Sequence, residues 1–360
     1  MIKARPKVRS IKATVKENCP VKIGLIGAGD VVESLHLPVL MRISGVTVKW
    51  VCDVSAARAR RLARDWGINR VFASLNDCSD LDAVLIATPV GSREAILKQT
   101  LERGWHALCE KPFAPDLRVH RSIIQAASKR NIKLGAGYMR RYYWAVERVR
   151  RIIEKQLLGP LRSISGSESA HLERTGIDHS SYRNNKSASG GGVLMETGCH
   201  LVDQLLFVAG ATGADIEKCS QRDWQGYEVE TVASGYLSLA SGGSAPVKIE
   251  LSGIRPMFQG ILLRCERGEL LLNLDPAMGF DVILGQLPGG SLELPYPGTM
   301  KHQYHVLQAF RDEWLNFIDA VNGHRLWDMD RETGLLTSEV IEQCAAIATP
   351  LKIEVPECVR

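Results

Sequence analysis

The sequence predicts an α/β protein in two parts: a doubly wound, mostly parallel sheet, followed by an α+β part built on an open, mainly antiparallel sheet. Its 360 residues are enough for two domains of roughly 150 residues each. From residue 21 to residue 140, short apolar runs alternate with helical patterns, which is typical of βαβ units. After residue 145, short segments of alternating polarity dominate and indicate antiparallel strands with one covered face.

In the first part, an apolar strand over residues 21–26 precedes Gly27 and a helical pattern that runs toward Leu40. The later strands also alternate with helices, so we expect the strands to lie parallel. These strands are expected at 46–52, 81–87, 105–109 and 132–137, with helices at 55–66, 93–103 and 117–130.

The second part is expected to begin with a helix over residues 145–155. Another helix, over residues 193–209, interrupts a series of short strands. The strands are expected at 161–169, 232–239, 247–251, 260–266 and 269–274, and closing helices near 305–321 and 332–348. We therefore divide the chain into a basic N-terminal extension (1–20), a first domain (21–140) and a second domain (141–360).

Charge and cysteine usage exclude several classes of protein. The net charge is +5, but residues 1–20 alone carry six basic groups and one acid, so the other 340 residues are neutral overall. This argues against a nucleic-acid partner, which needs a basic face on the folded body. No run of 18 apolar residues indicates a membrane span. The nine cysteines are scattered without a C-x-x-C pair, which favours reduced thiols in a cytoplasmic protein over disulfides or a metal site.

Gly27-Ala28-Gly29 lies between the first strand and the first helix, the context that a dinucleotide fingerprint of a Rossmann-like domain requires. The first glycine permits a tight turn, and the second lets a pyrophosphate approach the backbone at the helix N-terminus. The third position of the fingerprint is Val32, so the helix must pack on its strand in a different way. The cofactor-binding residues expected in this turn are Gly27, Ala28, Gly29, Asp30 and Val31.

Asp53 ends the second strand, 24 residues after Gly29. A carboxylate at this place can accept hydrogen bonds from both ribose hydroxyls and would repel a 2′-phosphate, which favours NAD over NADP. Arg58, five residues later, keeps NADP possible. The alternative is that Asp53 only caps the next helix.

Four motifs occur in order along the chain: Gly27-Ala-Gly29, Ala87-Thr-Pro89, Glu110-Lys-Pro112 and a Gly-x-His-x-x-Asp helix that contains His200 and Asp203. Over about residues 21 to 345, the sequence resembles the Gfo/Idh/MocA oxidoreductases, the glucose-fructose oxidoreductase and inositol dehydrogenase family. The resemblance implies an NAD(P) cofactor and a dimer or tetramer. It also implies that the turns contributing Ala87, Thr88, Pro89, Glu110 and Lys111 bind the cofactor.

The resemblance further implies three catalytic residues. Lys111 would lie between nicotinamide and substrate and hydrogen-bond the reacting hydroxyl, and His200 would be the general acid/base. Many family members carry an aspartate four residues before this histidine, where Glu196 stands here. Positions four apart share a helix face, so the Glu196 carboxylate is expected to raise the pKa of His200 and hold its ring. The alternatives are a solvated loop lysine and a structural histidine.

Four further residues lie outside these motifs. Arg93 stands where family members often carry a histidine, and no role is transferred to it. Arg141 and Tyr142 lie in a segment that resembles a family motif, so we expect them to line the substrate pocket; the alternative is a basic helix start packed on the sheet. Tyr182, in a polar loop before Gly190, is expected to bind substrate, although such a loop can equally be solvated surface.

The function expected from these features is an NAD(P)-dependent oxidoreductase. A hydride would pass between the nicotinamide and a secondary alcohol or ketone of a sugar, cyclitol or nucleotide sugar, and the proton would move through His200 with help from Lys111. Two alternatives stay open. One is elimination or hydrolysis through a transient oxidation, and the other is a dinucleotide-sensing regulatory protein without catalysis.

Overall fold

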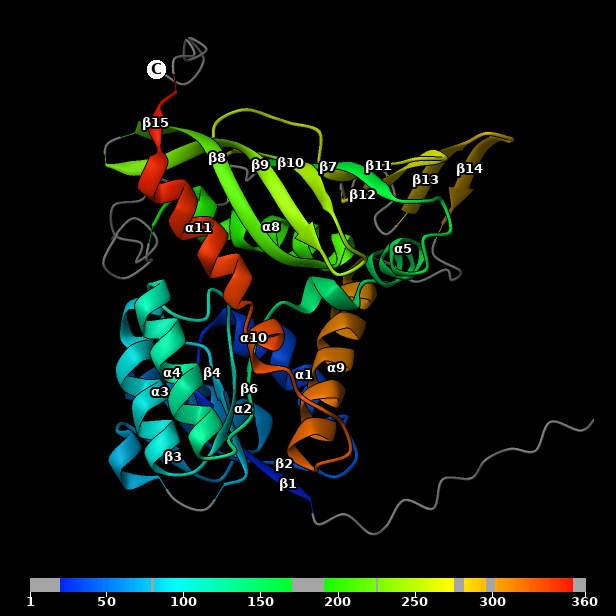
Figure 1. Ribbon diagram of the computed structural model, residues 1–360. Coiled ribbons are helices and arrows are strands. Elements are labelled where there is room, and N and C mark those ends of the chain that lie inside the picture. The colour runs from blue at the N-terminus through cyan, green and yellow to red at the C-terminus, as the bar shows by residue number, and fades with distance from the viewer. Residues whose placement is uncertain are drawn as a thin grey trace, which may run out of the picture.

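A computed structural model describes residues 20–78, 81–169, 191–224, 226–274, 282–295 and 302–351. Two sheets lie one above the other, and the helices lie on and between them (Figure 1). Tyr182 and the rest of the polar loop over residues 170–190 lie outside the described residues. Within the described part, no helix is both long and apolar enough to cross a membrane.

The first sheet has six parallel strands in the order β3-β2-β1-β4-β5-β6. These strands are β1 (Val21–Ile26), β2 (Val46–Cys52), β3 (Val71–Phe72), β4 (Ala83–Ile86), β5 (His106–Cys109) and β6 (Leu134–Ala136). The order reverses direction at β1 and β4, as in a doubly wound dinucleotide-binding sheet. The predicted fold class of the first part is therefore confirmed.

Helices cover both faces of this sheet. On one face, Leu25 and Leu85 pack with the helices that follow β1 and β2, and on the other face Ile26 and Ile86 pack with the helices that follow β4 and β5. All four side chains are buried, which explains why the central strands read as unbroken apolar runs. The helices are a π-helical turn (Val32–His36), α1 (Leu37–Leu40), α2 (Ala56–Trp66), α3 (Arg93–Glu102) and α4 (Leu117–Lys129).

The second sheet has nine strands in the order β14-β13-β12-β11-β7-β10-β9-β8-β15. Neighbours run antiparallel except for two pairs, β10 with β7 and β15 with β8. The strands are β7 (Leu161–Ser169), β8 (Ala211–Trp224), β9 (Tyr227–Leu239), β10 (Ser244–Ser252), β11 (Gly260–Cys265), β12 (Gly268–Asn273), β13 (Val282–Leu287), β14 (Gly290–Leu294) and β15 (Thr349–Pro350). The open, mainly antiparallel sheet is confirmed.

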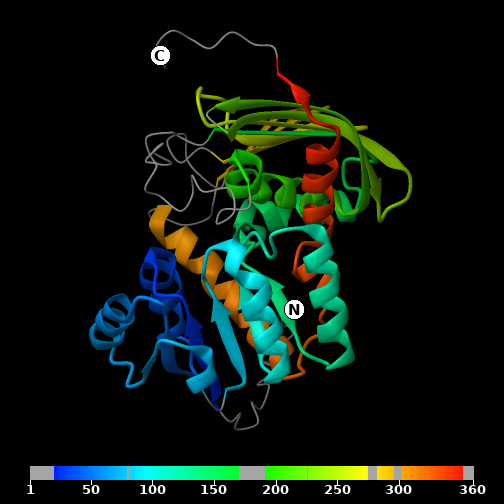
Figure 2. The same ribbon diagram turned by 90° about the vertical axis from the view of Figure 1, so that its left-hand side faces the viewer.

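Helices between the two sheets cover one face of the second sheet. These are α5 (Trp144–Glu154), α8 (Cys199–Ala209) and α11 (Leu335–Ile347). Helix α8 packs closely on β7, because a Cβ placed on Gly166 would come within 2.9 Å of Leu201. Figure 2 shows α11 rising from the first domain to the second sheet, so this helix joins the two halves.

The chain returns to the first domain near its end, which departs from our division at residue 140. Helix α9 (His302–Val321) packs along α1, and α10 (Met329–Glu332) packs against β6. Trp314 of α9 donates a hydrogen bond from Nε1 to Nδ1 of His36 at 3.0 Å. An amphipathic pattern predicts a helix but not the sheet that it covers, which is why the sequence placed α9 in the second domain.

Helix α9 also carries a carboxyl group that is buried without a hydrogen-bond partner in the part of the chain that the structure describes. The Glu313 side chain is 3% exposed, and neither of its oxygens has a hydrogen-bond partner among the described residues. Burial, together with the charge of nearby Glu110, raises the pKa of Glu313 well above its usual value. The folded protein therefore favours the protonated form of Glu313 more strongly than the unfolded chain does.

Replacing Glu313 by glutamine should stabilise the protein at pH 8 relative to pH 5. An acid whose pKa is raised on folding contributes stability below its unfolded pKa, and this is lost as pH rises through the folded pKa. Glutamine mimics the protonated acid and does not titrate, so we expect a gain of about 1–3 kcal/mol at pH 8. Urea unfolding at both pH values measures it.

The matched control is Glu154→Gln on α5, where the side chain is exposed. This change should alter the unfolding free energy by the same small amount at both pH values. If Glu313→Gln behaved like this control, the carboxyl group would be charged or solvated in the folded protein.

Candidate active site

The turn after β1 has the shape that a phosphate-binding loop requires. Gly27 has a φ of +107°, and a Cβ there would lie 2.4 Å from the carbonyl oxygen of Ala87, so only glycine fits. At Gly29 a Cβ would meet nothing within 4 Å, which leaves open space beside the backbone. Asp30 and Val31 begin the helix, where the leading N–H groups lie ahead of the first intrahelical hydrogen bonds and can face an anion.

Val32, where the fingerprint has its third glycine, is fully buried and begins the π-helical turn Val32–His36. With valine in place of the third glycine, the helix begins with this wider turn where it packs on β1. It brings His36 to a fully buried place behind the end of β5.

Asp53 at the end of β2 fastens the glycine turn. Its carboxylate accepts hydrogen bonds from the backbone N–H of Ala28 at 2.8 Å and of Ser55 at 2.7 Å. Helix α2 is capped by Ser55, whose Oγ accepts from the N–H of Arg58. The ribose contact stays a prediction, and it remains feasible because each carboxylate oxygen accepts more than one hydrogen bond.

Two turns follow the adjacent parallel strands β4 and β5, and Arg93 joins them. Its Nε and Nη2 donate to the carbonyl oxygen of Thr88 at 3.0 and 2.7 Å, and its Nη1 donates to the carbonyls of Glu110 and Pro112. The Arg93 side chain is buried. The sequence singled out this position but gave no sign that one guanidinium would bridge both turns.

The Glu110 side chain is held behind the second turn. Trp314 donates to Nδ1 of His36, so the ring proton is on Nε2, which donates to Glu110 at 2.9 Å. The other Glu110 oxygen accepts the backbone N–H of Lys111 at 3.1 Å. Burial works to raise the pKa of Glu110, but the hydrogen bond from His36 and the nearby charges of Lys111 and Arg93 outweigh it, so the pKa lies below its usual value.

Lys111 reaches from the first domain to the second. Its side chain is half-buried, and its Nζ donates to the backbone carbonyl of Glu196 at 2.8 Å. The Lys111–Pro112 peptide bond is cis. Glu196 lies in a π-helical turn (Leu194–Gly198) that leads directly into α8 and to His200. The structure thus brings together the three residues that the sequence assigned to catalysis.

The electrostatics of His200 differ from our expectation. Burial, together with the cations of Lys111 and Arg140, lowers the pKa of His200 well below its usual value, so the ring is neutral at pH 7. We had expected the Glu196 carboxylate to raise this pKa. That carboxylate instead accepts a hydrogen bond from the hydroxyl of Tyr227 at 3.0 Å. The expectation assumed α-helical spacing, whereas residues 194–198 form a wider π-helical turn.

Arg140 is a site residue that the sequence did not single out. Its guanidinium pairs with both oxygens of Glu168 at 2.8 and 2.9 Å, and it contributes to lowering the pKa of His200. Glu168 is buried near the end of β7. The available signals were two adjacent arginines in the short helix Met139–Tyr142 and a later acidic residue in β7, but neither indicates which arginine faces the histidine.

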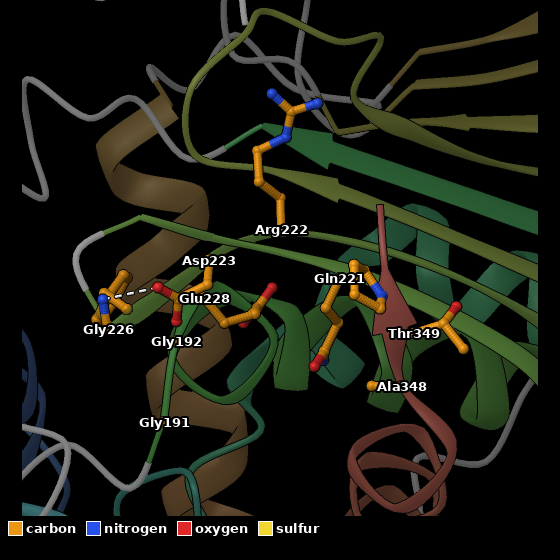
Figure 3. A pocket seen from close by; sticks show the side chains of 11 residues that line it. Gly191, Gly192, Gln221, Arg222, Asp223, Gly226, Glu228, Ala348 and Thr349 are labelled. Atoms are coloured by element: carbon orange, nitrogen blue, oxygen red, sulfur yellow. Dashed lines mark hydrogen bonds between the residues drawn. The ribbon is translucent and has the colours of Figure 1, made fainter. Parts of the chain in front are cut away.

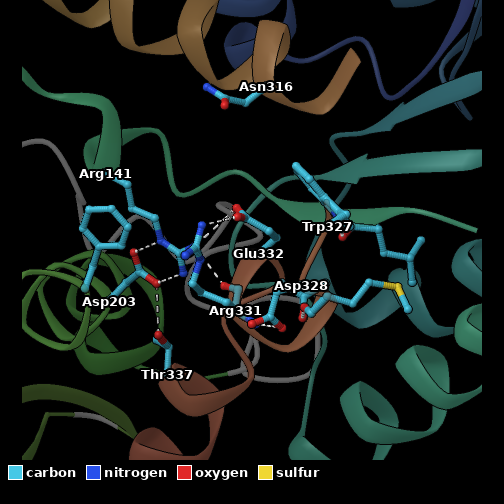
Figure 4. Close-up of polar contacts among 12 residues, drawn as sticks. Arg141, Asp203, Asn316, Trp327, Asp328, Arg331, Glu332 and Thr337 are labelled. Atoms are coloured by element: carbon cyan, nitrogen blue, oxygen red, sulfur yellow. Dashed lines mark hydrogen bonds and ion pairs between the residues drawn. The ribbon is translucent and has the colours of Figure 1, made fainter. Parts of the chain in front are cut away.

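Arg141, expected in the substrate pocket, lies in a buried ion pair (Figure 4). Its Nε and Nη2 donate to the Asp203 carboxylate at 2.8 and 2.5 Å, and its Nη1 donates to the carbonyl of Arg331. Thr337 also donates to Asp203, at 3.1 Å. These contacts join α8 to the segment before α11, and the contact of Arg141 with substrate stays a prediction.

Tyr142 is half-buried beside this network, where burial and the charge of Glu332 raise its pKa. Its contact with substrate stays a prediction, as does that of Tyr182. Within the described ranges, no cluster of His, Cys, Asp and Glu side chains is arranged to hold a metal ion.

A cavity of about 320 Å³ lies in the second domain (Figure 3). Tyr227 lines this cavity and also donates to the Glu196 carboxylate, but Lys111, Glu196 and His200 are not among the residues that line it. The sequence did not predict it. Its lining residues are Gly191, Gly192, Gln221, Arg222, Asp223, Gly226, Tyr227, Glu228, Ala348, Thr349 and Pro350.

Comparison with known proteins agrees with this geometry. Residues 21–138 match the family model described as "Oxidoreductase family, NAD-binding Rossmann fold", and residues 146–270 match the model of the GFO/IDH/MocA C-terminal domain. Among curated relatives, inositol 2-dehydrogenase 4 of Saccharopolyspora erythraea is 32% identical, over 39% of this chain and 43% of the relative. D-Glucoside 3-dehydrogenase of Escherichia coli is 26% identical, over 53% and 54%. The chain thus spans about half the length of the curated relatives it matches.

Solved structures share the fold over nearly the whole chain. KijD10, a 3-ketoreductase from Actinomadura kijaniata solved in complex with NADP and TDP-benzene, superposes with a TM-score of 0.77 and 18% identity, covering 93% of this chain and 100% of that chain. An oxidoreductase from Agrobacterium radiobacter, in complex with NAD+, L-tartaric acid and magnesium, superposes with a TM-score of 0.72 and 17% identity, covering 90% of this chain and 96% of the other.

Proposed function

Because the chain belongs to the Gfo/Idh/MocA family of oxidoreductases, we propose that it transfers a hydride between a nicotinamide cofactor and a secondary alcohol or ketone of a sugar, cyclitol or nucleotide sugar. One observation carries the proposal: the ammonium of Lys111 from the first domain lies 2.8 Å from the Glu196 carbonyl, beside His200 of the second domain. A substrate bound between the domains would meet both groups.

The residues of the glycine turn fit a dinucleotide. The open space at Gly29 can receive a pyrophosphate, and the first helical turn offers N–H donors to it. Asp53, Thr88, Pro89 and Glu110 stand at the ends of β2, β4 and β5, the edge of a doubly wound sheet at which ligands bind. When bound, the nicotinamide accepts or donates the hydride.

The protein's own groups would handle the proton and hold the substrate oxygen. Neutral His200 can take the proton of the substrate hydroxyl as the alcohol is oxidised, and return it during reduction. The Lys111 ammonium can donate a hydrogen bond to the same oxygen and stabilise the negative charge that develops on it. The Tyr227 hydroxyl holds the Glu196 carboxylate by a hydrogen bond and so fixes the position of this acceptor.

The names of the relatives support the substrate class. An inositol dehydrogenase, a glucoside dehydrogenase and a ketoreductase solved with a TDP compound are among the similar proteins. Inositol and glucosides are polyhydroxylated, and the candidate site offers donors and acceptors of hydrogen bonds to such groups. We also propose that the protein is cytoplasmic and that it forms a dimer or tetramer. Light scattering can measure its oligomeric state.

The proposal predicts that NAD raises the melting temperature and that a polyhydroxylated substrate changes absorbance at the reduced-nicotinamide band. A ligand at 100 times its Kd stabilises the native state by about 2.7 kcal/mol, a shift of several degrees. We expect a larger shift with NAD than with NADP, because Asp53 would repel the 2′-phosphate.

Gly29→Val is the variant designed to block the proposed pyrophosphate site, and the wild type is measured beside it. Its Cβ would point into open space, so the variant should fold like the wild type and lose the NAD shift. An equal shift in both proteins would place the cofactor elsewhere. NAD binding without turnover of any inositol, hexose, glucoside or nucleotide sugar would favour a regulatory protein, and product formation without net NADH would favour transient oxidation.

A further inference from the structure

Arg93 makes a set of contacts that few side chains can make. Its guanidinium hydrogen-bonds the carbonyls of Thr88, Glu110 and Pro112, which belong to the turns after β4 and β5. The two strands are adjacent and parallel, so both turns leave the same edge of the sheet. Arg93 is the first residue of α3, and its side chain is 4% exposed.

The contacts require a planar group with several donors. Arginine carries five N–H donors in a fixed plane, and here three nitrogens serve three carbonyls. A lysine ammonium donates from a single nitrogen, and a neutral histidine ring has one N–H. Neither can bridge the turns in the same way.

The carbonyls that Arg93 holds lie on both sides of Lys111. One Nη1 atom hydrogen-bonds the residue before Lys111 and the residue after it. The Lys111 N–H is bound by the Glu110 carboxylate, which His36 holds in turn. Arg93 thus holds the carbonyl groups on either side of Lys111, and the Glu110 carboxylate holds the Lys111 N–H. The Lys111 side chain extends to the second domain.

We propose that Arg93 is a positioning residue of the site: by holding the carbonyls that flank Lys111 against the turn after β4, it sets where the lysine ammonium meets the substrate. This inference rests on the proposed function. Arg93 stabilises the arrangement of the two turns and does not touch the reacting atoms. Its loss should therefore lower the rate of the chemical step more than the affinity for substrate.

Arg93→Ala and Arg93→Lys test the inference. Because a misplacement of about 1 Å can cost 10²-fold in rate, we expect kcat to fall by roughly 10²-fold in both variants, with little change in the substrate KM. Millimolar guanidinium should restore much of the rate of the alanine variant and none of the lysine variant, whose side chain fills the space. A purely structural arginine would show no such rescue of kcat.

Arg103→Ala is the matched control, because Arg103 lies at the other end of α3 and donates to the carbonyl of Cys78 at 2.8 Å. It should lose some stability and keep its kcat. The inference is overturned if Arg93→Ala keeps kcat within about threefold of the wild type, or if guanidinium restores nothing. Should the alanine variant not fold, a lysine variant with wild-type kcat overturns it, and failure of both to fold assigns Arg93 to stability alone.

A measurement without turnover separates this inference from the proposed function. Trace acetic anhydride followed by mass spectrometry reports how accessible the Lys111 amine is. We expect Lys111 to react several-fold faster in Arg93→Ala than in the wild type, because its turn opens locally. If the wild type turns over no substrate, the proposed function fails, and the labelling ratio still decides the role of Arg93: an unchanged ratio overturns it.

Discussion

Replacing Lys111 by methionine is expected to lower kcat by roughly 10²–10³-fold, the range lost when a hydrogen-bond donor to a developing negative charge is removed. Methionine has nearly the same length and no charge, so the variant removes the hydrogen bond and the cation while keeping most of the volume. The contact to the Glu196 carbonyl is also lost, and it costs about 1 kcal/mol of stability. Steady-state kinetics measures the effect, with whichever inositol, hexose, glucoside or nucleotide sugar the wild type turns over fastest.

The Kd of NADH should stay nearly unchanged in this variant, because the pyrophosphate and ribose contacts expected at the glycine turn and Asp53 do not involve Lys111. Lys98→Met is the control: this lysine pairs with Glu94 on the surface of α3, and its side chain is 57% exposed. It should have wild-type kcat. A Lys111→Met protein that kept more than about a tenth of the activity would remove Lys111 from the chemical step.

The parts of the fold that could be predicted from the sequence are those where one local rule acts alone. Gly27 must be glycine because of its backbone angle and the nearby Ala87 carbonyl, and the central strands of the first sheet are apolar because both faces are covered. The motif at Glu110 and Lys111 could likewise be placed at the end of a strand. These features depend on a few neighbouring residues.

Features that depend on distant contacts were missed. Strand β8 did not read as a strand because register shifts at residues 211–213, 216–218 and 222–223 break its alternation. Arg140 and Arg141 are neighbours in one short 3-10 helix, yet one pairs with Glu168 and the other with Asp203. Only the surrounding helices decide which arginine lies beside His200. The same holds for Glu196. Its carboxylate meets Tyr227 because residues 194–198 form a π-helical turn, which residue propensities do not predict.

His200 is expected to act as a base that is already neutral at pH 7. Because burial, Lys111 and Arg140 lower its pKa, alcohol oxidation should stay at full rate down to pH values below 6.5. His200→Gln should reduce kcat by roughly 10²–10⁴-fold. The pH profile of kcat/KM in the oxidation direction, together with an NMR titration of the His200 ring, measures both effects.

Arg140→Gln tests the cause of this lowered pKa. Removing the guanidinium takes away a cation and leaves the Glu168 carboxylate without its partner, and both changes favour protonated His200. The acid limb of the kcat/KM profile, where the rate falls as His200 becomes protonated, should therefore move up toward pH 6.5. Arg162→Gln is the control, because Arg162 pairs with Glu266 at the opposite end of β7, about 20 Å from Glu168 at 3.3 Å per residue.

That distance exceeds the Debye length of about 8 Å at physiological salt, so Arg162→Gln should leave the acid limb in place. A limb that moved equally in both variants would reflect net charge and not the contact between Arg140 and the site. A wild-type limb at or above pH 6.5 would mean that the ring is solvated when substrate binds, and the proton would then have to leave by another group.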